Sequence, residues 1–476
     1  MSFALSKAIA SSKVFLIPSN KLEQRWDPNY FRWMKVFRAR IKQCPHPIER
    51  LKPSLSLVQY GISERATEEP VGVPMLRMIN LQSDTWDISD MKYIAMSDEE
   101  KTPYLLRRDD ILFNRTNSKE LVGKCCVFNL PGEYVFASYL IRVRLNQRRL
   151  LPDYVTAYLA SPIGRIQIDA VSRQIAGMTN INAEEIRDLL IPVPSPAVQE
   201  QVAKAWRQAI RRRDQTLADA RTLLAQVDDR VLNTLGVTLA REIPHTLKDR
   251  VFVRRFNTLS GRRFDAPANW KRLSFAGGRF PMRNFRDVCL INPPTQPPKL
   301  DALEPVSFVP MEAVSETHGE ITDRQVRPLG ECKSYTTFQN RDLIWAKITP
   351  CMENGKSAIA QNLIGGFGFG STEFHVFRPK TKELSVEYIH LLFRLGVLRN
   401  HARLFFGGSS GHQRVDELFF HELEIPVPSV EDQKQLVRQA KEIKERAQKL
   451  FDNAAKELEQ SKREIEALII GLVNHI

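Results

Sequence analysis

The sequence lacks the cysteine spacing of a disulfide framework or a zinc site. Its 476 residues include six cysteines, at positions 44, 125, 126, 289, 332 and 351, and no two of them form a C-x-x-C pair. This usage predicts a reduced, cytoplasmic protein. Cys125 and Cys126 are adjacent, and we expect them to lie on a strand with one side chain on each face.

Long apolar runs are missing as well. No segment approaches the roughly 20 apolar residues that a membrane-spanning helix needs. The N-terminal stretch MSFALSKAIASSKVFLIPSN is only mildly apolar and lacks the long apolar region and cleavage pattern of a signal peptide. The sequence therefore predicts neither a membrane span nor an export signal.

Catalytic motifs are few, and each has a simpler interpretation. The segment INPPT (291–295) is similar to the Asn-Pro-Pro-aromatic motif of amino-methylating DNA methyltransferases, but a threonine replaces the aromatic residue that stacks a flipped base. The segment GGFGFG (365–370) leads into a predicted strand, whereas a phosphate-binding glycine loop opens a helix. The segment ENGK (353–356) has no upstream acidic partner, and the nine histidines show no metal-ligand spacing. The sequence thus favours binding over catalysis.

Positive charge is in excess. Lysine and arginine total 69 residues against 55 aspartates and glutamates, a formal net charge of +14. Such a balance indicates an acidic partner, which could be nucleic acid, an anionic membrane surface or an acidic protein.

The strongest signal is an internal repeat. The motif Ile-Pro-Val-Pro-Ser occurs at residues 191–195 and again at 425–429, and a glutamine follows each copy, at Gln199 and Gln433. Further positions match at nearly the same offset along the chain: Asp110 and Asp342, Gly123–Lys124 and Gly355–Lys356, Ser138 and Ser371, and Tyr154 and Tyr388. Such ordered agreement predicts two copies of one structural unit. We expect residues 24–30 and 262–270 to open the two copies, and Gly123 and Gly355 to supply an unusual backbone angle.

Each copy shows the same order of elements. Short strand-like runs come first, a short helix follows, and the prolines of Ile-Pro-Val-Pro then force an extended joint before a long helix. Apolar residues recur at heptad spacing in both long helices. In the first copy they are Val202, Trp206, Ala209, Leu217, Ala220, Leu224, Val227 and Val231, with Arg213 between them; in the second they are Leu436, Ala440, Ile443, Ala447, Leu450, Ala454, Ile465, Leu468 and Leu472, with Leu458 and Ser461 interrupting the series.

This heptad pattern predicts a coiled coil. At about 1.5 Å per residue, each helix would be roughly 55–65 Å long, too long to bury its apolar stripe alone. We expect the two helices to pair with each other, and the return of the chain through the second globular region makes the pairing antiparallel. The predicted fold is mixed α/β, with two globular domains related by a pseudo-two-fold axis and separated by the antiparallel coiled coil.

Two polar loops fall at matching places in the two copies but differ in sequence. The first spans residues 114–124 and 346–356, and the second spans 172–182 and 407–416. Side chains of these types read base edges and contact phosphates, so we expect the loops to bind DNA. The candidate residues are Arg115, Thr116, Asn117, Ser118, Lys119, Lys124, Arg173, Gln174, Thr179 and Asn180 in the first copy, and Lys347, Thr349, Asn354, Lys356, Ser409, Ser410, His412, Gln413 and Arg414 in the second.

Together these features resemble the specificity subunit of type I restriction–modification systems. The resemblance rests on the duplicated IPVP…Q before a long helix, on DILFNRTNSKELVGK and DLIWAKITPCMENGK, and on FGSTEFHVFRP, and it covers nearly the whole chain. It implies two α/β target-recognition domains, at residues 1–195 and, with a linker, 238–428, and two conserved helices, at 196–237 and 429–476, that form the coiled coil.

The resemblance also implies a bacterial, cytoplasmic subunit for antiviral defence that is not itself catalytic. Such a subunit binds a bipartite, asymmetric sequence in double-stranded DNA. It recruits two modification subunits, and in the full complex two restriction subunits, and these partners bring S-adenosylmethionine, ATP and Mg²⁺. Two alternatives stay open: a specificity factor of a related DNA-modification defence system, and a self-sufficient DNA adenine methyltransferase that uses the 291–295 segment.

Overall fold

A computed structural model describes residues 27–82, 84–117, 121–175, 178–237, 253, 278–296, 301–408 and 413–472, with only the backbone described at 117, 173–175 and 178. These residues belong to two compact units. Unit 1 comprises the chain up to Leu217 together with the chain from Phe451 onward, and unit 2 comprises Ala218–Leu450. Each unit therefore contains one half of both long helices, α6 (Pro196–Leu235) and α12 (Val430–Ile469).

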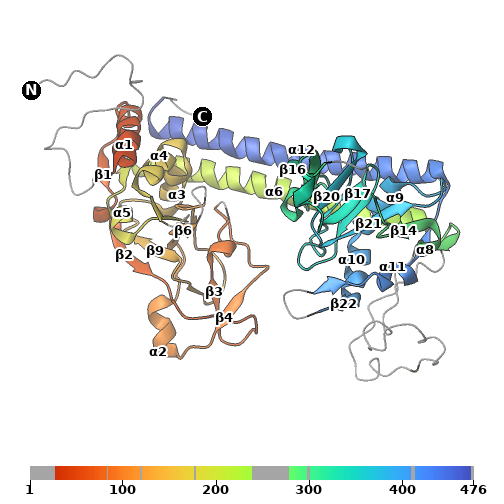
Figure 1. Ribbon diagram of the computed structural model, residues 1–476. Helices are drawn as coiled ribbons and strands as arrows, with labels where there is room; N and C mark the ends of the chain where they lie inside the picture. The colour runs from red at the N-terminus through yellow and green to blue at the C-terminus, as the bar shows by residue number, and fades with distance from the viewer. Residues whose placement is uncertain are drawn as a thin grey trace, which may run out of the picture. The chain divides into compact units, whose positions relative to one another are not determined.

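Unit 1 is built on a four-stranded antiparallel sheet with the order β2-β9-β5-β7 and a three-stranded sheet with the order β4-β3-β8. Helix α1 packs against α4 beside the first sheet (Figure 1). The strands are β1 (Ile48–Arg50), β2 (Leu55–Tyr60), β3 (Val73–Leu76), β4 (Lys92–Ile94), β5 (Ile111–Asn114), β6 (Thr116–Asn117), β7 (Cys125–Val127), β8 (Val135–Phe136), β9 (Leu140–Leu145), β10 (Arg173–Ile175), β11 (Met178–Asn180) and β12 (Leu190–Pro192). The helices include α1 (Pro28–Ile41), α2 (Asp98–Lys101), α3 (Pro152–Ala160), α4 (Pro162–Val171) and α5 (Ala183–Arg187).

Unit 2 contains a four-stranded antiparallel sheet with the order β14-β21-β18-β19 and a second sheet with the order β16-β15-β20-β17. Its strands are β13 (Met282–Asn284), β14 (Cys289–Ile291), β15 (Pro305–Val309), β16 (Gln325–Pro328), β17 (Thr336–Gln339), β18 (Leu343–Ala346), β19 (Ser357–Ile359), β20 (Phe367–Gly370), β21 (Phe374–Pro379), β22 (Phe406–Gly407), β23 (Arg414–Val415) and β24 (Glu424–Pro426). Its helices include α8 (Phe285–Val288), α9 (Val386–Phe393), α10 (Gly396–Ala402) and α11 (Leu418–Glu422).

The internal repeat is confirmed by the topology. Strands β2, β9, β5 and β7 take the same sheet positions as β14, β21, β18 and β19, and the parallel pair β3–β8 corresponds to β15–β20. A buried ion pair is repeated as well. The carboxylate of Asp110 accepts hydrogen bonds from Arg144 at 2.6 and 2.7 Å, and that of Asp342 accepts from Arg378 at 2.7 and 2.8 Å. These two arginines satisfy carboxylates that would otherwise be costly to bury.

The Ile-Pro-Val-Pro motif forms the expected extended segment, but it is more than a joint. Its first residues lie in β12 and β24, which pair antiparallel with β1 and β13. The hydroxyl of Tyr154 donates to the carbonyl of Pro192 at 2.9 Å, and that of Tyr388 donates to Pro426 at 2.8 Å. Each motif is therefore held by backbone pairing on one side and by a buried tyrosine from α3 or α9 on the other.

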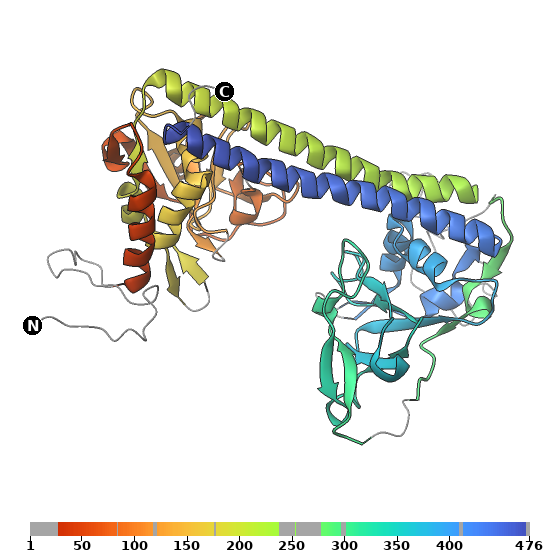
Figure 2. The same cartoon turned by 90° about the horizontal axis from the view of Figure 1, so that it is seen from above.

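The long helices have 40 residues each, which corresponds to about 60 Å. In unit 1 the start of α6 and the end of α12 share one core, and in unit 2 the end of α6 and the start of α12 share another. The two segments lie side by side in antiparallel directions within each unit (Figure 2). The expectation of an antiparallel helix pair is thus met in each unit.

The heptad prediction was wrong at three positions. Leu458 and Ser461 were expected to interrupt the seam, yet both side chains are buried, as is Arg213, which lies between the predicted seam residues. Leu472 was assigned to the seam, but α12 ends at Ile469 and Leu472 is 63% exposed. Burial of Arg213 is possible because its guanidinium donates to Asp214 at 2.6 Å and to Thr85 at 3.3 Å in a turn that packs on the helix.

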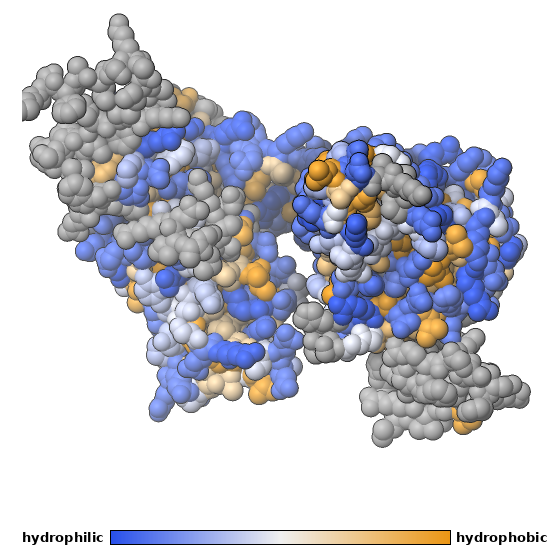
Figure 3. All heavy atoms as spheres, viewed as in Figure 1, coloured by the Kyte–Doolittle hydropathy of each residue, from blue (hydrophilic) through white to orange (hydrophobic). Residues whose placement is uncertain are grey.

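Smaller predictions also have clear outcomes. Cys125 and Cys126 lie on β7 and belong to two different cores, as expected for opposite faces of a strand. The visible face of each unit is mostly hydrophilic (Figure 3). Residues 262–270 lie outside the described part of the chain, and the four domain boundaries stay predictions, because the compact units divide the long helices at their middles. Among the described residues, no helix is long and apolar enough to span a membrane.

Candidate nucleic-acid interface

In unit 1 the two predicted DNA-binding loops form one small sheet. Strand β6 pairs antiparallel with β11, so that Asn117 lies opposite Thr179 and Thr116 lies opposite Asn180. The Thr116 hydroxyl donates to Asn180 Oδ1 at 2.5 Å. Strand β10, with Arg173 and Gln174, completes the order β10-β11-β6. The structure therefore brings together six of the ten candidate residues of the first copy.

The same two loops also meet in unit 2. The backbone N–H of Thr349 donates to the Gln413 carbonyl at 3.0 Å, and Ile348 forms a bridge with Arg414. The N–H of Val415 donates to the Lys347 carbonyl at 2.9 Å, matching the bond from Ile181 to Arg115 at the same distance in unit 1. The strands differ in length between the units, but the contact between the loops is repeated.

A glycine turn closes the first loop in each unit. Gly123 has a φ of +78° and Gly355 a φ of +81°, which confirms the predicted unusual backbone angle. The N–H of Asn114 donates to the Lys124 carbonyl at 2.8 Å, and the N–H of Ala346 donates to the Lys356 carbonyl at 2.9 Å. The two lysines therefore have equivalent places, next to the left-handed glycine.

Several candidate side chains already have partners within the protein. The guanidinium of Arg115 lies 4.9 Å from the ring centre of Tyr60. Arg414 donates to the Glu373 carboxylate at 2.7 and 2.8 Å, and this contact lowers the pKa of Glu373. Lys356 donates to the Met311 carbonyl at 3.1 Å, and its side chain is only 15% exposed. Asn354 Nδ2 donates to Glu316 at 3.2 Å. To reach DNA, each of these groups must exchange or share an existing contact.

Lys124 lies in a different electrostatic setting. Its side chain is half-buried, and burial is the main cause that lowers its pKa, followed by the positive charges of Lys462 and Arg165. An ammonium group among other cations gains more than an isolated one from a nearby anion such as a phosphate. Ser118, Lys119, Ser409, Ser410 and His412 lie outside the described residues.

Sequence reasoning missed several residues next to these loops. The carbonyl of Tyr139 accepts the backbone N–H of Arg115 at 3.1 Å, and the Tyr139 side chain is 54% exposed, so its ring is free to stack on a base or sugar. Arg165 and Arg399 bond the carbonyls just before the two glycine turns. These two arginines are offset along the chain by the same amount as Ile191 and Ile425, and that offset was the signal that could have identified them.

The residues behind the enzyme alternative have structural roles. Asn292 Oδ1 accepts the backbone N–H of Val376 at 3.0 Å, and its Nδ2 donates to Glu417 at 3.0 Å. The segment 365–370 ends in β20, a buried strand. Glu353 pairs with Arg403 at 2.8 Å. In the described part of the chain, no group of three or more His, Cys, Asp or Glu side chains could hold a metal ion.

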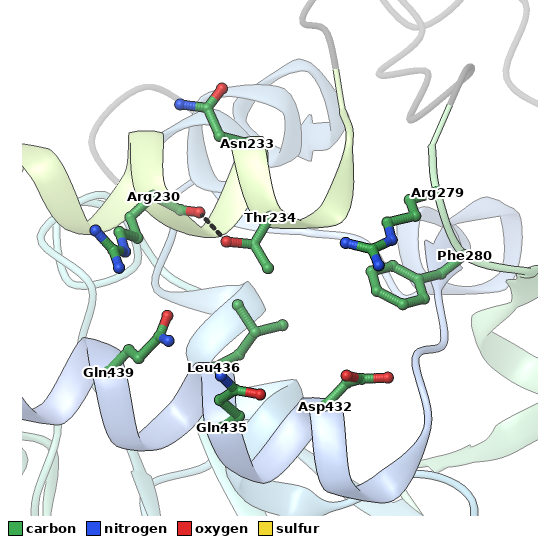
Figure 4. Close-up of a pocket in the computed structure, with 9 residues that line it drawn as sticks. All are labelled: Arg230, Asn233, Thr234, Arg279, Phe280, Asp432, Gln435, Leu436 and Gln439. Carbon is green, nitrogen blue, oxygen red and sulfur yellow. Dashed lines mark hydrogen bonds between the residues drawn. The ribbon is translucent and has the colours of Figure 1, made fainter.

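A cavity of about 570 Å³ lies between the end of α6 and the start of α12 in unit 2 (Figure 4). Arg230 and Thr234 of α6 face Gln435, Leu436 and Gln439 of α12 across it, and Asn233, Arg279, Phe280 and Asp432 also line it. None of the candidate DNA-binding residues borders it. Its mixture of charges and amides is typical of a solvated groove between helix ends.

The repeated units and the paired long helices define a duplicated α/β protein, and several known proteins have similar sequences. Residues 280–460 match the family described as the type I restriction modification DNA specificity domain. The chain is also similar to curated specificity subunits of type I restriction enzymes. It is 34% identical over 175 residues to the type I restriction enzyme EcoEI specificity subunit of Escherichia coli, a stretch that covers 37% of this chain and 27% of that relative.

Another relative is the EcoKI specificity subunit of Escherichia coli strain K12. It is 27% identical over 187 residues, which cover 39% of each chain. The matches thus span well under half the length of these curated relatives. A solved structure of the HsdS subunit from Thermoanaerobacter tengcongensis is 14% identical over 89% of this chain and 95% of its own, with a TM-score of 0.34. A chain from a study of complex assembly in the type I R-M system reaches 0.47 at 14% identity, over 89% of this chain and 97% of its own.

Proposed function

We propose that this chain reads DNA sequence for a type I restriction–modification complex. Each unit contacts one half of a bipartite, asymmetric target through its pair of polar loops. The observation that carries the proposal is that the same two loops meet in both units on a shared framework, while their side chains differ. A shared framework with different reading residues is what two unlike half-sites require.

Within each unit, charged and uncharged polar side chains have different roles in DNA binding. Lysine and arginine side chains such as Lys124 neutralise phosphates, which supplies affinity and a strong dependence on salt. Asparagine, threonine and glutamine side chains at the paired loops offer donors and acceptors to base edges, which supplies discrimination. The excess of positive charge over the chain supports an electrostatic contribution of this kind.

The chain would act without chemistry of its own in the cytoplasm. Methyl transfer to adenine would come from two modification subunits that bind S-adenosylmethionine, and two restriction subunits with ATP and Mg²⁺ would complete the assembly. The hydrogen bonds of Asn292 support this division, because they occupy the side chain that a methyltransferase would use on its substrate.

The test is a map of methylated motifs in a host with and without this gene, with the modification gene present in both. We expect a two-part motif, split by an unspecified spacer, that disappears when the gene is removed. A motif that persists without the gene, or a single continuous motif, would contradict the proposal. Purified chain alone should not transfer a methyl group, and methylation by wild type that is lost in Asn292→Ala would establish the enzyme alternative.

A further inference from the structure

An arginine on the second short helix holds the glycine turn in each unit. Arg165 of α4 donates from Nη1 to the Val122 carbonyl at 2.6 Å. Arg399 of α10, its counterpart in the second copy, donates from Nη1 to the Glu353 carbonyl at 2.6 Å. Both carbonyls lie in the turn that leads into Gly123 or Gly355. Charge-assisted bonds of this length are among the stronger ones in proteins, so the turn is fixed to its helix.

The glycine turns are also in close contact with the same two helices. A Cβ atom at Gly123 would lie 2.3 Å from Ile168 Cγ2 on α4, and one at Gly355 would lie 2.8 Å from a guanidinium nitrogen of Arg399 on α10. With a left-handed φ in addition, no residue with a side chain fits either place without displacement. The first DNA-binding loop therefore packs closely against α4 in unit 1 and against the Arg399 side chain of α10 in unit 2.

Both short helices are in turn attached to the long helices. Glu466 of α12 accepts the N–H of Ile163 at 3.0 Å in the first turn of α4. Asp228 of α6 accepts the N–H of Gly396 at 2.6 Å in the first turn of α10. In each unit a carboxylate on a long helix caps a short helix, and an arginine on that short helix bonds the first DNA-binding loop. The connection is repeated although the capping residues differ.

Each of the two arginines also interacts with a carboxylate of its own unit. Arg165 also pairs with Asp169 at 2.7 Å. Burial is the main cause that lowers the pKa of Arg399, and Asp228 opposes that shift. Both guanidinium groups therefore have partners inside the protein.

We propose that Arg165 and Arg399 are positioning residues for sequence readout, one for each half of the target. The inference rests on the proposed function and deepens it by naming residues that set specificity without contacting DNA. Loss of either arginine frees one glycine turn, so the donors and acceptors of that unit no longer meet base edges in a fixed place. Discrimination in one half of the motif then falls, while the other half is read normally.

The two units should not respond equally. In unit 2, Arg394 donates to the carbonyls of Gly355, Glu316 and Thr317, each at 2.8 Å, so a second arginine holds the same turn. The position in unit 1 that matches Arg394 at the offset of the repeat is Ala160, which cannot form these bonds. Arg165→Ala should therefore relax its half of the motif more than Arg399→Ala relaxes the other. The double variant Arg394→Ala/Arg399→Ala should relax its half as much as Arg165→Ala relaxes the first.

The experiment maps methylated motifs in a host that carries the modification gene and wild type, Arg165→Ala, Arg399→Ala or Arg211→Ala. Arg211 is an exposed arginine of α6 and serves as the matched control. We expect Arg165→Ala to lose about tenfold discrimination at positions in one half of the motif, Arg399→Ala to lose less at positions in the other half, and Arg211→Ala to leave both halves intact. An unchanged motif in both variants would overturn the inference, and so would relaxation of the same half, or loss of both halves, in either variant.

Salt dependence separates positioning from phosphate contact. With wild-type and variant complexes purified with the modification subunits, affinity for a cognate duplex and a scrambled duplex is measured from low to high salt. Positioning predicts weaker cognate binding with an unchanged salt slope and unchanged binding to the scrambled duplex. A slope reduced by about one, with equal loss on both duplexes, would mean that the arginine contacts phosphate and would overturn the inference. Arg165→Lys retains one donor and should give an intermediate loss.

Failure of this inference and failure of the proposed function are distinguishable. If wild type gives no two-part motif that depends on the gene, the proposed function is wrong. If wild type gives the motif and all arginine variants give the same one, only the positioning role is wrong.

Discussion

Single glutamines fix where the long helices begin. Gln433 accepts the N–H of Ser385 at 2.9 Å and donates to the carbonyls of Glu383 and Pro428 at 2.6 and 2.9 Å. Gln199 makes the same three bonds in unit 1, to Leu151, Arg149 and Pro194. One amide group thus satisfies three backbone groups of a loop and a proline-rich joint that have no regular secondary-structure partner.

Gln433→Ala should therefore be costly. It leaves one buried donor and two acceptors unsatisfied, and we expect the free energy of unfolding to fall by about 2–3 kcal/mol. Urea denaturation of the full chain measures the change. Gln435→Ala is the control, because Gln435 is an exposed residue of the same helix and should change stability by less than about 0.5 kcal/mol. Equal losses in the two variants would show that the three hydrogen bonds contribute nothing.

His390 introduces a dependence on pH. Burial, with the positive charges of Arg394 and Lys444 as further causes, lowers its pKa to about 3, against 6.5 for an ordinary histidine. Below pH 6.5 the unfolded chain binds a proton that the folded chain excludes. Stability from the neutral imidazole is therefore complete above pH 6.5 and is lost as the pH falls toward 3.

His390→Gln should weaken this acid sensitivity. Between pH 7 and pH 4.5, wild type should lose about 2 kcal/mol more unfolding free energy than the variant. Denaturation at both pH values gives the comparison, with His318→Gln, a change at an exposed histidine, as the control. If wild type and His390→Gln show the same pH dependence, His390 is not the residue responsible.

At the scale of secondary-structure elements, small residues are placed on the buried face of α12. Ala447 and Ala454 have almost no exposed surface, whereas Ala455, the next residue, is exposed. Alanine at buried positions allows close helix packing, so a larger side chain there must displace its neighbours.

Ala454→Leu and Ala455→Leu form a matched pair. The first should lower the unfolding free energy by about 1–3 kcal/mol through overpacking. The second adds the same side chain to the solvent-exposed face and should change stability by less than about 0.5 kcal/mol. Thermal or urea denaturation distinguishes them, and the interpretation of the buried face is wrong if the two variants behave alike.

The heptads predicted the helices well because burial of an apolar stripe leaves a regular trace in the sequence. The heptad pattern did not predict the burial of Leu458 and Arg213, and the reason is physical. Within unit 1 the helices also contact the rest of the unit, which widens the buried face beyond a two-helix seam. The turn with Thr85 covers Arg213. Because Thr85 is distant in the sequence, the residues around Arg213 do not predict this contact. The pairing of the Ile-Pro-Val-Pro strands with β1 and β13 was hidden for the same reason.

At the scale of the whole molecule, charge should control DNA affinity. For the wild-type complex, the logarithm of the association constant should fall steeply and linearly with the logarithm of salt concentration. Lys124→Ala should reduce that slope by about one if its ammonium neutralises one phosphate. Filter binding or fluorescence anisotropy on the cognate duplex measures both. Lys204→Ala, a change on the exposed face of α6, is the control, and an unchanged slope in Lys124→Ala would remove that lysine from the DNA contacts.

The candidate interface was only partly accessible from sequence. The repeat predicted which loops correspond, because matched glycines and lysines leave a visible offset. It did not predict that Thr116 and Asn180 would bond each other, since β-pairing between distant segments depends on the folded backbone. Nor did it separate Lys124 from Lys356, which have the same place in the repeat. A carbonyl and a carboxylate contributed by the segment around residues 311–316 occupy Lys356.

The division of the helices between the units has a consequence for synthesis. Unit 2 is one continuous stretch, Ala218–Leu450, so all of its residues are synthesised without interruption by another unit. The core of unit 1 instead needs Leu458, Ile465 and Leu468, which are made after all of unit 2. Until then the apolar face of the first half of α6 has no α12 segment to cover it. Unit 1, whose synthesis begins first, is therefore the unit whose core is completed last. A nascent chain halted near Leu450 would contain all residues of unit 2 but would lack the α12 segment that completes the core of unit 1.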